Sequence, residues 1–262
     1  MSKILNKQLK KLDKEEEKIL NKKETNIIKE KLNPITEKVE SVIPEKLKLT
    51  LDGAFYNGFK LVLNKGTKFI EKMYDKEKIQ LEYDINNYSL QRKVNRKALK
   101  ILDKQSRKSN FLNMTISTIE GGGLGILGVG LPDIPLFIAM ILKTIYEITL
   151  SYGFNYENEE ERVYILNLIR AAIAKGELQA EISKQLDEMS DKLDSGNHIN
   201  YDLDKEIKKA SNSLSQGMLT AKFIQGIPLV GVIGGITNYN VINKVSKFAS
   251  IKYKKRYLKK NL

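Results

Sequence analysis

The feature that most constrains this chain is an apolar run from Glu120 to Pro135, EGGGLGILGVGLPDIP, which holds six glycines and two prolines. Glycine loses more backbone entropy on folding than any other residue, so such a cluster needs a physical reason. The usual reason is a close approach to the backbone by another helix, by the phosphates of a ligand, or by lipid-facing partners. Which of the three applies decides the class of function.

Gly123, Gly125 and Gly128 match the dinucleotide-binding pattern GxGxxG, but their context argues against that function. The pattern needs a helix directly after the glycines and an acidic residue at the end of the next strand. Pro132 and Pro135 stand where that helix would run, and no repeated strand-helix-strand pattern follows. No Lys-Ser or Lys-Thr follows the glycines, so a P-loop is not expected either. We expect no nucleotide cofactor.

The composition predicts a folded protein with a sizeable core, because 41% of the 262 residues are hydrophobic. The chain has no cysteine, which rules out disulfides, a thiol nucleophile and thiolate metal ligands, and which fits the cytoplasm. Its formal net charge is +13, which indicates an anionic partner.

The positive charge is concentrated in two clusters that adjoin the apolar segments. The first comprises Arg92, Lys93, Arg96, Lys97, Lys100, Lys104, Arg107 and Lys108, and the second comprises Lys244, Lys247, Lys252, Lys254, Lys255, Arg256, Lys259 and Lys260. Such clusters either solvate the outer faces of helices or attract an anionic membrane surface. They lack the interleaved aromatic residues of a nucleic-acid platform, so no nucleic acid is expected as a partner.

Helical periodicity recurs along the chain and strand signals are few, so we predict an all-α fold, a multi-helix bundle that contains two glycine-rich apolar helical hairpin segments. Residues 1–44 form a charged helical extension, loosely attached, and residues 45–262 form the helical domain. Within the domain we expect breaks near Gly66 and around Asp84 to Tyr88.

Three residues carry helix-end signals in the middle of the chain. Asp133 precedes an apolar-periodic stretch and is expected to cap its helix, with Pro135 in the first turn. Gly153 stands where a helix C′ glycine belongs. Asn158, followed by three glutamates, is expected to cap the next helix.

Catalytic and metal-binding chemistry have little support. His198, the one histidine, lies in the polar stretch SGNHINYD, where a solvated loop residue is expected rather than a general base. A zinc site would need several His or Cys ligands, so no metal is expected. A carboxylate pair formed by Asp133 and Glu120 is the one enzymatic alternative, for hydrolysis or metal binding.

Neither apolar stretch near the glycines is suited to cross a membrane, which takes about twenty apolar residues. Residues 116–131 fall short and contain Glu120, while residues 134–150 contain Lys143 and Glu147. A buried hairpin, a re-entrant hairpin or an interfacial segment remains. The GxxxG spacings at Gly121 and Gly125 and at Gly231 and Gly235 would let helices pack closely, in lipid or in a protein core.

These segments resemble the bacterial EcsC family. The resemblance rests on GVGLPDIPLF at residues 128–137, SYGFNYENEEER at residues 151–162, and IPLVGVIGGITNYNVI at residues 227–242 followed by a basic tail, and it covers residues 47–258. It implies an all-helical protein that is often encoded near an ABC transporter linked to secretion, and it implies no known reaction. A weaker similarity connects the chain to helical domains appended to bacterial membrane-linked GTPases.

The candidate site residues are motif positions that could line a pocket: Glu120, Gly121, Gly125, Gly128, Asp133, Tyr152, Gly153, Glu161, Arg162, Pro228, Gly231, Gly235 and Asn238. The leading hypothesis is a non-enzymatic accessory protein, attached peripherally to the cytoplasmic face of an anionic membrane and working with a membrane protein such as an ABC transporter. In it, the two basic clusters face the lipid. The alternative is a helical binding module for a lipid or hydrophobic small molecule, with Asp133 at the mouth of the pocket.

Overall fold

The structure, a computed structural model, describes residues 2–21, 43–92, 99–101, 103–104, 133–224 and 235–262. In these ranges the chain is helical and has no strand, which confirms the predicted all-α class. The elements in these ranges are α1 (Ser2–Leu20), α3 (Glu45–Leu61), the π-helix η1 (Val62–Gly66), α4 (Thr67–Glu71), α5 (Lys76–Arg92), α8 (Asp133–Ser151), α9 (Glu159–Ile173), α10 (Gly176–Asp194), α11 (Leu203–Ile224) and α12 (Gly235–Lys260). Most of the two predicted glycine-rich hairpin segments lies outside these ranges, which resume at Asp133 in the first segment and at Gly235 in the second.

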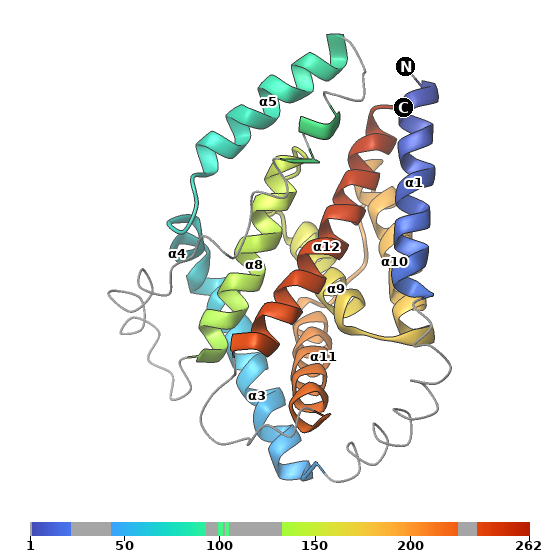
Figure 1. Ribbon diagram of the computed structural model, residues 1–262. Coiled ribbons are helices and arrows are strands. Elements are labelled where there is room, and N and C mark those ends of the chain that lie inside the picture. The colour runs from blue at the N-terminus through green and yellow to red at the C-terminus, as the bar shows by residue number, and fades with distance from the viewer. Residues whose placement is uncertain (1, 22–42, 93–98, 102, 105–132, 225–234) are drawn as a thin grey trace.

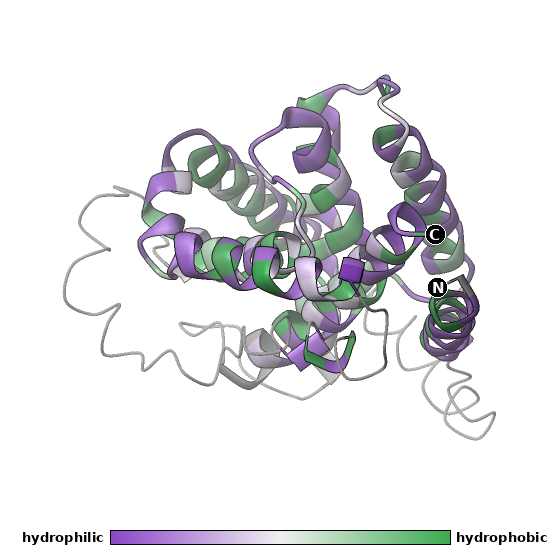
Figure 2. Cartoon of the chain, turned by 90° about the horizontal axis from the view of Figure 1, so that it is seen from above, coloured by the Kyte–Doolittle hydropathy of each residue, from purple (hydrophilic) through white to green (hydrophobic). Residues whose placement is uncertain are grey.

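Helix α12 runs through the middle of the bundle (Figure 1). It packs against α8 on one side, against α1 and α10 on the other, and also against α9. Helix α11 packs on α3 and α9, and α5 packs along α8. Seen from above, hydrophilic residues cover much of the outside of the bundle (Figure 2). Buried side chains from all these helices join in one hydrophobic cluster.

Helix α8 is apolar on nearly every side, as expected of a helix that is surrounded by others. Contrary to the expectation from Lys143 and Glu147, its stretch Ile134–Ser151, with a mean hydropathy of 1.5, is by length and composition apolar enough to cross a membrane, the only such helix among the described residues. In this fold 83% of that stretch is buried, as in the core helix of a bundle. Its charged residues, Lys143 and Glu147, pair with each other at 2.9 Å.

Two of the predicted helix ends are confirmed in atomic detail. The N–H of Phe154 donates to the carbonyl of Thr149 at 3.0 Å and the N–H of Gly153 donates to that of Leu150 at 2.9 Å, the pattern of a Schellman C-cap. At the start of α9, the side chain of Asn158 accepts from the N–H of Glu160 at 3.0 Å. Both caps depend on a few neighbouring residues, which is why the local sequence was enough to predict them.

The predicted helix breaks are wrong. Helix α5 continues through residues 84–88, because tertiary contacts there override the weak helix propensity of asparagine. One such contact is the hydrogen bond from the Tyr257 hydroxyl to the side chain of Asn87, 2.8 Å long. Near Gly66, the chain passes from α3 through the single π-helical turn η1 directly into α4.

Contrary to the expectation of a loosely attached extension, helix α1 packs against the rest of the bundle. Leu5 and Leu12 are 2% and 4% exposed and belong to the same hydrophobic cluster as the rest of the bundle. The helix lies antiparallel to the C-terminal part of α12, so the first residues of α1 lie close to the end of the chain (Figure 1). Residues 1–44 therefore include a helix that is part of the folded body.

The capping geometry predicts opposite effects for two glycine-to-alanine substitutions. Gly153→Ala should destabilise the protein by more than about 1 kcal/mol. The backbone there has φ +75°, and an added Cβ would lie 2.1 Å from Cζ of Tyr83. Gly53→Ala, within α3, meets nothing within 4 Å and should stabilise the protein by up to about 1 kcal/mol. Urea unfolding of both variants measures the difference, and equal effects would contradict the assignment.

Candidate functional site

The second basic cluster turns into the protein instead of facing solvent. Lys252, Lys254 and Arg256 on α12 are 1%, 7% and 3% exposed. Each pairs with a carboxylate of the same chain: Lys252 with Glu16 of α1, Lys254 with Asp103, and Arg256 with Glu161 of α9. The expectation that these residues face a membrane does not hold for this fold. Lys244, Lys247, Lys259 and Lys260 are exposed.

Arg256 lies between two carboxylates. One terminal nitrogen of its guanidinium donates to Glu161 Oε1 at 2.5 Å and the other donates to Oε2 at 3.0 Å, a bidentate pair. Its Nε and its second terminal nitrogen also donate to the carboxylate of Asp194, at 3.0 and 2.7 Å. The pair thus ties the first turn of α9 to the end of α10 and to α12.

Aromatic rings complete the surroundings of Arg256. Its guanidinium carbon lies 4.3, 4.6 and 5.4 Å from the ring centres of Phe154, Tyr164 and Tyr253, which is cation–π distance. The Tyr253 hydroxyl donates to Glu161 Oε1 at 2.7 Å. These rings exclude water, so the ionic contacts gain strength from the low local dielectric.

The electrostatics fix the protonation states of this cluster. Burial acts to lower the pKa of Arg256, but the carboxylates of Glu161 and Asp194 outweigh it, so the pKa is raised. Burial also raises the pKa of Tyr164 and Tyr253 well above the usual value. The arginine therefore stays charged and both tyrosines stay neutral near pH 7. This arrangement suits a clamp between helices better than acid–base chemistry, which needs a pKa near the working pH.

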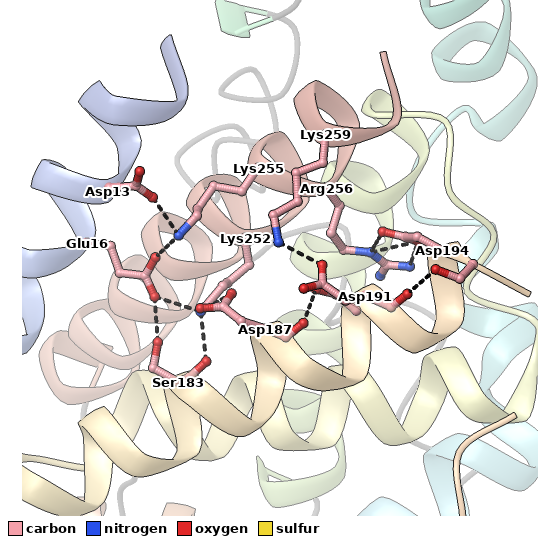
Figure 3. Close-up of polar contacts among 12 residues, drawn as sticks. Asp13, Glu16, Ser183, Asp187, Asp191, Asp194, Lys252, Lys255, Arg256 and Lys259 are labelled. Atoms are coloured by element: carbon pink, nitrogen blue, oxygen red, sulfur yellow. Dashed lines mark hydrogen bonds and ion pairs between the residues drawn. The ribbon is translucent and has the colours of Figure 1, made fainter. Parts of the chain in front are cut away.

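A second ionic cluster joins α1 to α12 and α10 (Figure 3). The Lys252 ammonium is 2.6 Å from Glu16 Oε1 and 2.7 Å from Asp187 Oδ1, and it donates to the Ser183 carbonyl at 2.9 Å. Lys255 bridges Asp13 and Glu16 of α1, at 2.8 Å from each. Glu16, which is 4% exposed, thus accepts from both lysines.

The remaining sequence-predicted residues are scattered. Tyr152 packs in the core with its ring 6.2 Å from that of Tyr257. The Nε of Arg162 is buried without a hydrogen-bond partner, in contrast to its neighbour Glu161. Asp133 begins α8 and Gly235 begins α12, as helix starts. Asn238 lies in the first turn of α12. The predicted positions Glu120, Gly121, Gly125, Gly128, Pro228 and Gly231 lie outside the described residues.

The first basic cluster is described only in part. Arg92 is exposed and donates from Nε and Nη2 to the Tyr88 hydroxyl, at 3.0 and 2.9 Å. Lys100 and Lys104 are exposed. The other members, Lys93, Arg96, Lys97, Arg107 and Lys108, lie outside the described residues.

Catalytic candidates gain no support from the geometry. His198 has a side chain that is 93% exposed and lies 3.2 Å from Glu160, so the prediction of a solvated loop residue is confirmed. No group of three or more His, Asp or Glu residues in the described ranges could hold a metal ion. Glu120 lies outside those ranges, so the Asp133 and Glu120 pair stays a hypothesis.

Sequence reasoning missed the acidic half of both clusters. Glu16 lies in the stretch predicted to be a charged helical extension, and Asp187, Asp191 and Asp194 belong to no predicted site. One signal was present: these three aspartates recur on one face of α10 at spacings of four and three, and the α12 cations Lys252, Arg256 and Lys259 recur in the same way. Asp187 pairs with Lys252, Asp194 with Arg256 and Asp191 with Lys259.

Removing one side of the Arg256 pair should be costly. Glu161→Ala leaves the arginine buried with one carboxylate, and we expect a loss of about 3–5 kcal/mol in the free energy of unfolding. Tyr253→Phe removes one hydrogen bond to a charged group and should cost about 2 kcal/mol. Urea unfolding measures both. The matched control is Glu159→Ala, two residues away and exposed, and a similar loss in this control would contradict the clamp.

The contribution of Glu16 should depend on pH. Burial acts to raise its pKa, but Lys252 and the hydrogen bonds from Lys255 and Ser183 outweigh burial, so the pKa lies below its reference value of 4.5. Its stabilisation is therefore complete above pH 4.5 and is lost as the pH falls through the folded-state pKa. Urea unfolding should give a higher free energy of unfolding for the wild type than for Glu16→Gln at neutral pH, and this difference should become smaller in acid. A difference that does not change with pH would contradict the ion pair.

Comparison with known proteins agrees with the motif resemblance. Uncharacterized protein YdbA of Bacillus subtilis (strain 168) is 22% identical over 183 residues, which is 64% of this chain and 62% of YdbA. Protein EcsC of the same strain is 21% identical over 160 residues, which is 59% of this chain and 63% of EcsC. The chain thus spans less than two thirds of the length of these relatives, and no solved structure matches it.

The model of the EcsC protein family matches residues 6–258. The match begins within α1, well before the residue 47 expected from the motifs, so the helix that holds Glu16 is included in it. It also covers Glu161 and Arg256. The chain therefore belongs to the EcsC protein family.

Proposed function

We propose that this protein is a non-enzymatic accessory protein that attaches peripherally to an anionic membrane at its cytoplasmic face. The observation that carries the proposal is the outer face of α1, which presents six exposed lysines, Lys3, Lys7, Lys10, Lys11, Lys14 and Lys18. On the inner face, Ile4, Leu5, Leu9, Leu12, Ile19 and Leu20 are buried or half-buried. A basic amphipathic helix of this kind is typical of attachment to a membrane surface.

The charge balance of α1 supports this attachment. Of its four acidic residues, Asp13 and Glu16 pair with lysines of α12, and Glu15 lies 3.6 Å from Lys11. The fourth, Glu17, is exposed, so within the described residues the six lysines of the outer face outnumber Glu15 and Glu17 and leave that face with net positive charge. A lysine near an anionic leaflet contributes about 1 kcal/mol, so several together can hold a protein reversibly at the surface.

The exposed members of the predicted basic clusters would add to this surface charge. They include Arg92, Lys100 and Lys104 from the first cluster and Lys244 and Lys247 from the second. An ABC transporter or another membrane protein remains the protein partner implied by the family resemblance, and a membrane-attached chain would meet it at the bilayer.

Vesicle sedimentation tests the proposal. The full chain should bind vesicles of phosphatidylcholine with phosphatidylserine, bind pure phosphatidylcholine weakly, and dissociate in high salt. Substituting Lys7, Lys10 and Lys14 together by Gln should reduce binding by more than tenfold, because three cations of the attachment face are lost. The matched control substitutes Lys175, Lys184 and Lys205, exposed lysines outside α1. Vesicle binding that does not change with lipid charge or with salt concentration would refute electrostatic attachment.

A further inference from the structure

The seat of α1, meaning the surface through which this helix packs on the bundle, is narrow and partly polar. Among its described side chains only Leu5, Leu12 and Glu16 are buried. The Glu16 carboxylate is the polar centre of this seat, since it accepts from Lys252, Lys255 and the Ser183 hydroxyl. One ionisable group thus joins α1 to both α10 and α12 (Figure 3).

Lys252 and Lys255, which both pair with α1, would retain different partners if α1 moved away. Lys252 would retain Asp187 and the Ser183 carbonyl, both on α10. Among the described residues, Lys255 forms its ion pairs with Asp13 and Glu16, both on α1. Departure of α1 would therefore leave these two lysines with Asp187 as the carboxylate that acts on both, so the surface left behind would carry net positive charge.

The apolar side of α1 would also need a new environment. Leu5, Leu12 and the half-buried Ile4 and Leu9 would enter water if the helix moved into solvent, which is unfavourable. The headgroup and acyl boundary of a bilayer takes up such a face, while the lysines on the other face meet lipid phosphates. An anionic bilayer is the surface that satisfies both faces.

We propose that α1 leaves α12 when the protein binds an anionic membrane, so that its apolar face enters the bilayer interface and lipid phosphates replace Asp13 and Glu16 beside Lys255. This inference rests on the proposed function and identifies the element that contacts lipid. It separates two modes of attachment. A docked α1 would contact lipid with its lysines alone, whereas an undocked α1 would insert Leu9 into the bilayer interface.

The absence of tryptophan from the chain makes the two modes distinguishable. In the full-length Leu9→Trp variant, and in a second reporter, Ile4→Trp, fluorescence reports on the inner face of α1 alone. With vesicles of phosphatidylserine and brominated phosphatidylcholine, we expect a blue shift and strong quenching in the bound protein. A Leu178→Trp control, exposed on α10, should not be quenched. Bound protein without quenching of either α1 reporter would overturn the inference and leave the proposed function intact.

Weakening the seat should strengthen membrane binding. Glu16→Gln removes the carboxylate shared by Lys252 and Lys255, and we expect vesicle affinity to rise roughly fivefold above that of Glu17→Gln, the factor given by about 1 kcal/mol of lost docking. Glu17 is the matched control, since it is exposed and loses the same charge. Equal affinities of the two variants would overturn the inference. A wild-type chain that binds no anionic vesicles would refute the proposed function itself.

Discussion

The buried pair of Arg256 and Glu161 is the interaction on which the arrangement of the bundle depends. A guanidinium can occupy the interior only if carboxylates and hydrogen bonds replace its water shell. Here Glu161 and Asp194 supply the carboxylates and the rings of Phe154, Tyr164 and Tyr253 surround the cation. Since these groups come from α9, α10, α12 and the turn before α9, their contacts fix how the helices meet. A shift of any one of them would leave a charge buried without a partner.

Inward-facing cations also change what the net charge of +13 means for partners. Of the second basic cluster, Lys252, Lys254, Lys255 and Arg256 neutralise acids of the same chain and add little to the surface field. The accessible charge instead includes the lysines of α1. Net charge counted along a sequence thus does not give the distribution that a membrane would meet.

Features that depend on a few neighbouring residues could be predicted from the sequence. The Gly153 C-cap and the Asn158 N-cap follow from backbone geometry within one helical turn, and the all-α class follows from apolar periodicity. The direction of the α12 lysines could not be predicted, because an exposed lysine face and an ion-paired one have the same spacing. The role of Glu16 could not be predicted either, since its partners lie 167 to 239 residues away along the chain. Helix α5 persisted through two asparagines because Tyr257 bonds to one of them.

The π-helical turn η1 joins α3 and α4 into one rod with an extra residue in the winding. Each residue turns a helix by about 100°, so this residue sets the phase of everything that follows it in α4. With this phase, Ile70 is fully buried, and Glu71 accepts a hydrogen bond of 2.7 Å from Tyr156 in the turn before α9. A one-residue deletion in η1 would restore regular α-helix yet rotate both side chains away, so conventional winding at this point is incompatible with the tertiary fold.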